Sequence, residues 1–241
     1  MESSTKERSN QRKYALTAGI SLVIMTLAAF FSYGFAHESL VVPGDAEATF
    51  HNITSSTTLF KAEIIGWIII LISDIVVAWA FYLFIKPIHQ SLSLLGAWLR
   101  LTYATILGMA ILNLIFVLLL TINTDYLSLL KTDQLQALIM LFLQAFESIW
   151  SIGLIIFGGH LMIVGYLAFK SENIPKVISI LLLVASIGYI VIHLGKAFLP
   201  QYDEVISILN LVFIVPMIAG ELGFGIWLLF RGGKLSKDTL Y

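Results

Sequence analysis

Four ionisable side chains lie inside apolar segments of this 241-residue chain: Asp74, Arg100, His160 and Glu221. Counted from the basic or polar residue that ends each segment, all four lie about 15–18 Å along a helix that rises about 1.5 Å per residue. That depth is close to the middle of a hydrocarbon core about 30 Å thick. Because charge is costly in hydrocarbon, four such residues in one layer indicate a polar centre that pairs charges, carries protons or contacts a polar ligand.

Asp74 and Arg100 occupy near mirror positions about the turn at residues 87–89. A hairpin of the two flanking helices would bring their side chains to the same level, so we expect an ion pair. Pairing inside a membrane is how such residues usually persist. A buried pair can also be a purely structural device that fixes the register of the two helices.

His160 and Glu221 share the same predicted level and could form a proton relay. His160 follows Gly158–Gly159, which lets a neighbouring backbone approach, so this position is also a packing site. Glu221 follows Pro216 by five positions. A proline removes one backbone hydrogen bond, so this helix resembles the interrupted helices of transport sites or carries an ordinary proline kink.

A second group of polar side chains is expected near the outer ends of the helices: Glu63, Glu147, His193 and Lys196. Histidines and carboxylates can bind a divalent metal. No motif with metal-binding spacing such as H-E-x-x-H is present, and a solvated outer rim is the simpler interpretation. The sequence therefore predicts neither a metal nor a cofactor site.

The composition is that of a membrane protein. Hydrophobic residues make up 59% of the chain and charged residues 12%, and the mean hydropathy is +0.92. Soluble domains average about 45–50% apolar and about 25% charged residues. The net charge of −1 offers no basic field for nucleic acid, and the absence of cysteine excludes disulfides and thiolate chemistry. The expected partner is the lipid bilayer.

Six segments are long and apolar enough to span a bilayer, which predicts an all-α integral membrane bundle of six transmembrane helices. The whole chain, 1–241, is expected to form one transmembrane domain. We also expect an outer interfacial segment at about 125–143. The predicted spans are 14–36, 57–86, 90–122, 144–170, 175–199 and 203–231.

The loop charges predict the orientation. With the N-terminus in the cytoplasm, ten basic residues fall on the cytoplasmic side and three on the outer side. Positive charge in loops favours the cytoplasm, so both termini are expected there. The ten are Lys6, Arg8, Arg12, Lys13, Lys86, Lys170, Lys176, Arg231, Lys234 and Lys237, and the three are Lys61, Lys131 and Lys196.

Short stretches that resemble a known family are spread over nearly the whole chain after residue 14. They are Leu40-Val41-Val42-Pro43-Gly44-Asp45-Ala46, Ser73-Asp74, Leu99-Arg100-Leu101, Phe157-Gly158-Gly159-His160 through Gly165-Tyr166-Leu167, Gly188-Tyr189, Phe198-Leu199-Pro200-Gln201-Tyr202 and Gly220-Glu221-Leu222. These stretches are similar to a bacterial multi-pass family, the domain of unknown function 4386. The similarity implies a bacterial cytoplasmic (inner) membrane protein and adds no activity.

Three functions fit these observations. The first is a permease-like or small-ligand-binding protein, in which Asp74–Arg100 sets the charge of a cavity and His160–Glu221 carries protons or contacts a polar ligand. The second is a structural or regulatory membrane protein whose buried charges only fix helix packing. The third is an intramembrane enzyme with His160 and Glu221 as acid and base. A cavity reaching His160 and Glu221 would favour transport or catalysis, whereas a dry centre with Asp74 locked to Arg100 would favour the structural function.

Overall fold

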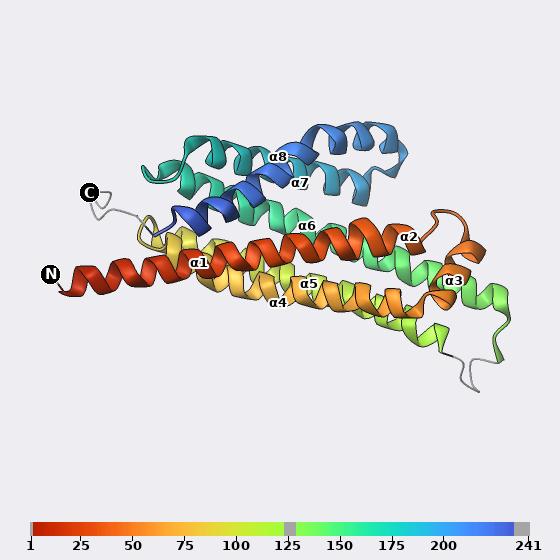
Figure 1. Cartoon of the computed structure of the whole chain (residues 1–241). Coiled ribbons are helices and arrows are strands. Elements are labelled where there is room, and N and C mark those ends of the chain that lie inside the picture. The colour runs from red at the N-terminus through yellow and green to blue at the C-terminus, as the bar shows by residue number, and fades with distance from the viewer. Residues whose placement is uncertain (1, 123–128, 234–241) are drawn as a thin grey trace. The chain divides into compact units, whose positions relative to one another are not determined.

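A computed structural model describes residues 2–122 and 129–233 of the chain, and within these residues the regular structure is entirely helical (Figure 1). Six helices are long and apolar enough to cross a bilayer, so the protein is an all-α multi-pass membrane protein. The elements are α1 (Glu2–Phe31), η1 (Ser32–His37), α2 (Glu38–Leu40), α3 (Ala46–Ser55), α4 (Thr57–Ile85), α5 (Gln90–Thr121), α6 (Thr132–Lys170), α7 (Lys176–Phe198), η3 (Pro200–Tyr202) and α8 (Asp203–Phe230).

Four of the predicted spans agree with α4, α5, α7 and α8 to within one residue at each end. Local residues explain these limits. Pro87 follows the end of α4, and Pro175 is the residue before the first turn of α7. After α8 the chain turns at Gly233, whose φ of 97° suits glycine because it has no Cβ.

The first span extends beyond its predicted end at residue 36. Helix α1 continues through the π-helical turn η1 into α2, and the membrane-length segment is Ser9–Leu40. Past Leu40 the chain turns and enters α3. Asp45 caps α3, since its carboxylate accepts a hydrogen bond of 2.9 Å from the backbone N–H of Ala48.

The predicted interfacial segment at 125–143 is not separated from the fourth span. Residues 125–128 of that segment lie outside the described residues, and α6 runs without a break from Thr132 to Lys170. No proline occurs within α6. The helical backbone hydrogen bonds therefore continue across the predicted boundary between 143 and 144.

The chain divides into two compact units. Unit 1 comprises Met1–Ile24, Ile72–Ala104 and Ser151–Tyr241, and unit 2 comprises Met25–Leu71 and Thr105–Trp150. Asp74, Arg100, His160 and Glu221 all belong to unit 1. The two units are described separately below.

Glycines allow the helices of unit 1 to approach closely. A Cβ at Gly158 of α6 would lie 2.9 Å from the carbonyl oxygen of Ser186 on α7. A Cβ at Gly220 of α8 would lie 3.2 Å from the carbonyl carbon of Leu181, also on α7. Helices α7 and α8 therefore pack side by side (Figure 1), as small residues permit in membranes.

The same unit joins α1 to the end of α8 through Arg12. Its guanidinium donates to the carbonyl oxygens of Leu228 (3.1 Å), Leu229 (2.6 Å) and Gly232 (2.9 Å). The last carbonyls of a helix have no partner within the helix, and a cation there also complements the helix dipole. Arg12 thus satisfies the C-terminal end of α8.

Candidate functional site

Asp74 and Arg100 form a buried ion pair in unit 1. The Nη2 atom of Arg100 lies 2.7 Å from Oδ1 of Asp74, and both residues are fully buried. The guanidinium also lies over the rings of Phe81 and Phe157, at 5.8 and 5.2 Å from their centroids. Aromatic faces attract cations, so Arg100 is held by a carboxylate and by two rings.

His160 continues this network from α6. Its Nδ1 lies 2.8 Å from the carbonyl oxygen of Gly96, and its Nε2 lies 3.1 Å from Nη1 of Arg100. A carbonyl only accepts and a guanidinium only donates. The imidazole therefore carries its proton on Nδ1 and accepts from Arg100 at Nε2. His160 is neutral in this arrangement, because a proton on Nε2 would face the N–H of Arg100.

Glu221 has a different partner from the one predicted. The hydroxyl of Tyr189 on α7 donates to Oε1 of Glu221 over 2.8 Å. In the described chain no hydrogen bond joins Glu221 to His160. Gly220, next to Glu221 in the sequence, packs against the backbone of Leu181 and Leu182 in α7, the helix that carries Tyr189. Glu221 is half-buried, whereas Asp74, Arg100 and His160 have no exposed surface.

The ring of Tyr189 leads on to another histidine. His193, one turn further along α7, stacks on Tyr189 at a centroid distance of 6.2 Å. Its Nδ1 lies 2.8 Å from the hydroxyl of Ser151 on α6. Lys196, which was predicted to lie in one cluster with His193, is exposed. Both residues belong to unit 1.

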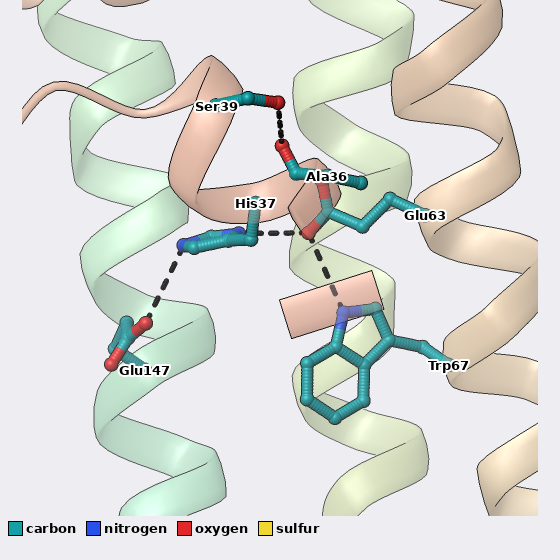
Figure 2. Close-up of polar contacts among 6 residues, drawn as sticks. All are labelled: Ala36, His37, Ser39, Glu63, Trp67 and Glu147. Atoms are coloured by element: carbon teal, nitrogen blue, oxygen red, sulfur yellow. Dashed lines mark hydrogen bonds and ion pairs between the residues drawn. The ribbon is translucent and has the colours of Figure 1, made fainter. Parts of the chain in front are cut away.

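The two carboxylates of that predicted cluster belong to unit 2, where they meet a histidine that the sequence analysis did not select. His37 lies between Glu63 of α4 and Glu147 of α6 (Figure 2). Its Nδ1 is 2.7 Å from Oε1 of Glu63, and its Nε2 is 3.4 Å from Oε1 of Glu147. The indole N–H of Trp67 also donates to Oε1 of Glu63, over 3.4 Å.

Aromatic rings enclose His37. Tyr33 stacks on its imidazole at a centroid distance of 5.6 Å and an interplanar angle of 14°, and Phe146 lies 5.9 Å away. Trp67 and Trp150 pack edge to face next to these rings, with their ring centroids 4.9 Å apart. The side chain of Glu63 is fully buried and that of His37 is 7% exposed, whereas that of Glu147 is 40% exposed. The three polar groups thus run from a partly exposed carboxylate to a buried one.

Sequence reasoning missed His37 because the predicted first span ended at Ala36, which placed the histidine in a loop. The π-helical turn η1 keeps it in the helix and directs it at α4 and α6. Single π-helical turns recur at functional sites. In residues 2–122 and 129–233, no three His, Asp or Glu side chains are grouped so that they could hold a metal ion. His37 instead separates its two carboxylates.

The six membrane-length helices found among the described residues define the class as a multi-pass α-helical membrane protein. The chain belongs to the family described as domain of unknown function (DUF4386), which matches it over residues 17–232. It is also similar to an uncharacterized protein of Archaeoglobus fulgidus, with 30% identity over 177 residues, which are 73% of this chain and 86% of the relative. No solved structure matches the chain.

Proposed function

We propose that the protein is a permease-like membrane protein in which Glu221 is the group that binds and releases a proton. The charge count of the polar centre carries this proposal. Arg100 contributes one positive charge and stays protonated, Asp74 and Glu221 contribute two negative charges when ionised, and His160 is neutral. One carboxylate is therefore uncompensated within this network. An uncompensated charge is costly within a membrane, and binding a proton is the simplest way to neutralise it.

Glu221 is also the least buried member of the centre. It is half-buried, and the one hydrogen bond that its carboxylate forms with the described residues comes from Tyr189. Pro216 in α8 has no backbone N–H, so the carbonyl group one turn earlier lacks its usual helical hydrogen bond. These features support reversible binding at Glu221, because little of its surroundings must rearrange when the proton leaves.

The other three residues of the centre support a structural role. Asp74, Arg100 and His160 are fully buried, the charges of Asp74 and Arg100 compensate each other, and His160 contacts the guanidinium. The structural interpretation of the buried charges therefore suits this part of the centre. An acid–base enzyme would need His160 and Glu221 to act on one substrate. Both ring nitrogens of His160 are already engaged, so no observation favours that second function.

We further infer that the protein lies in a bacterial cytoplasmic membrane as one transmembrane domain with both termini in the cytoplasm. The excess of basic residues in the loops assigned to that side supports this orientation. The ligand of the permease-like protein is a proton, alone or together with a small polar molecule.

A hydrophobic carbodiimide tests the proposal in liposomes. The protonated carboxyl group adds across a C=N bond of the reagent: its oxygen bonds to the central carbon and its proton moves to nitrogen. The acyl group then migrates to nitrogen as a stable N-acylurea. Modification at Glu221 is expected to fall as the pH is raised and to vanish in Glu221→Gln. The buried Asp74 serves as an internal control and should remain unmodified in peptide maps.

The same maps decide against the proposal in two cases. Glu221 could stay unmodified at every pH at which the protein is folded. Alternatively, its modification could be independent of pH. Either result would show that Glu221 does not exchange a proton with its surroundings.

A further inference from the structure

We propose that Glu147, His37 and Glu63 of unit 2 form a second proton-binding site, a relay in which His37 passes a proton between the partly exposed Glu147 and the buried Glu63. The site is independent of Glu221, which belongs to unit 1. The proposal rests on the position of His37 between the two carboxylates. Each ring nitrogen of His37 faces a different carboxylate, at 2.7 Å for Glu63 and 3.4 Å for Glu147 (Figure 2).

The transfer balances without any other reactant. Glu147 takes a proton from water at its exposed side and gives it to Nε2 of His37. The proton on Nδ1 of His37 then moves to Oε1 of Glu63. Glu147 ends as a carboxylate, Glu63 as a carboxylic acid, and the imidazole as its other tautomer. The reverse sequence returns the proton, so the relay loads and unloads Glu63.

The hydrogen bonding of Glu63 supports its role as the buried proton acceptor. Its Oε1 receives the N–H groups of His37 and Trp67, but its buried Oε2 has no hydrogen-bond partner among the described residues. A buried anionic oxygen without a donor is costly. Protonation removes the charge and with it most of this cost, so the surroundings of Glu63 suit a carboxyl group that is intermittently neutral.

The surroundings of His37 suit an imidazolium intermediate. Its ring stacks on Tyr33 and lies against Phe146, and aromatic faces stabilise a cation. The titratable side chains found in contact with it are Glu63 from α4, Glu147 from α6 and Tyr33 from η1. Aromatic rings fill the space next to the imidazole, so a proton reaches Glu63 through the polar side chains of Glu147 and His37.

The backbone holds this geometry tightly. A Cβ at Gly66 of α4 would lie 1.9 Å from the hydroxyl oxygen of Ser32 in η1, so a side chain there would displace that hydroxyl. Gly66 lies between Glu63 and Trp67 along α4, and Ser32 begins the π-helical turn that ends at His37. The glycine thus sets how closely the histidine approaches its carboxylate.

Nitrogen NMR of ¹⁵N-histidine-labelled protein in liposomes tests the relay, with the His37 signal assigned from its loss in His37→Gln. Wild-type His37 should carry protons on both ring nitrogens at low pH and on Nδ1 alone at high pH. Glu147→Gln and Glu63→Gln should each move the midpoint of this titration to lower pH, because each removes an anion that favours imidazolium. Glu38→Gln is the matched control, since Glu38 is the exposed next residue and should leave the midpoint unchanged.

Infrared difference spectra provide the second measurement. An acid pulse should produce the carbonyl band of a protonated carboxyl group that is absent in Glu63→Gln and slowed in His37→Gln. A His37 midpoint unaffected by Glu147→Gln, or a Glu63 band that never changes with pH, would overturn the relay. Glu221→Gln should alter neither signal. Loss of carbodiimide labelling at Glu221 with both signals intact would therefore refute only the function proposed above.

Discussion

At the scale of single residues, charge compensation divides the buried polar groups into two kinds. Asp74, Arg100 and His160 form one fully buried network, in which the carboxylate and the guanidinium compensate each other's charge. Glu221 and Glu63 each belong to a group with at least one more carboxylate than cationic side chain. We propose that groups of the first kind hold the helices in register and that groups of the second kind change their protonation state.

The ion pair gives a stability prediction. Arg100→Met should lower the free energy of unfolding by about 3–5 kcal/mol, because it leaves the charge of Asp74 buried and unpaired. The double variant Asp74→Leu with Arg100→Met should recover most of this loss, since both charges are then removed. Thermal or denaturant unfolding in detergent measures the two values. If the double variant is less stable than Arg100→Met, the pair is not the source of the effect.

At the scale of elements, two backbone features position the polar groups. Glycines on α6 and α8 bring α7 close enough for Tyr189 to reach Glu221. The π-helical turn η1 directs His37 at Glu63. A π-helical turn contains one residue more than an α-helical turn, and one residue corresponds to a rotation of about 100° around the helix axis. This turn therefore decides which way His37 points.

The contact between α6 and α7 can be tested with a methyl group. In Gly158→Ala the new Cβ would lie 2.9 Å from the carbonyl oxygen of Ser186 and closer still to Ile190. We expect a loss of about 1–3 kcal/mol in the free energy of unfolding from overpacking.

Gly223→Ala is the matched control, because no other atom lies within 4 Å of the position of its Cβ. Alanine favours helix over glycine by up to about 1 kcal/mol, so this variant should be neutral or stabilised. Equal losses in both variants, measured by unfolding in the same detergent, would contradict a role for close packing at Gly158.

At the scale of the whole molecule, the proposed orientation is open to direct measurement because the chain contains no cysteine. Single cysteines at Glu47 and Glu172, both exposed positions, should react differently with a membrane-impermeant maleimide added to intact cells. Glu47→Cys, in the predicted outer loop, should be labelled. Glu172→Cys, in a predicted cytoplasmic loop, should be labelled only after the membrane is permeabilised. The opposite pattern would place both termini outside.

The spans could be predicted from local properties. Helix length in a membrane follows from the run of apolar residues, and prolines and glycines mark the ends, so the limits of α4, α5, α7 and α8 matched closely. The contact between Asp74 and Arg100 could also be foreseen, because a short turn makes neighbouring helices antiparallel and brings positions equidistant from it to one level.

The partners of His160, Glu221 and His37 depended on packing between helices that are distant in the sequence. Apolar length alone does not determine how a helix rotates about its axis or how closely its neighbour approaches. The glycine contacts of α7 and the additional residue in η1 set those two quantities. They joined Glu221 to Tyr189 and placed His37 between two carboxylates, which no count of depth along separate helices could specify.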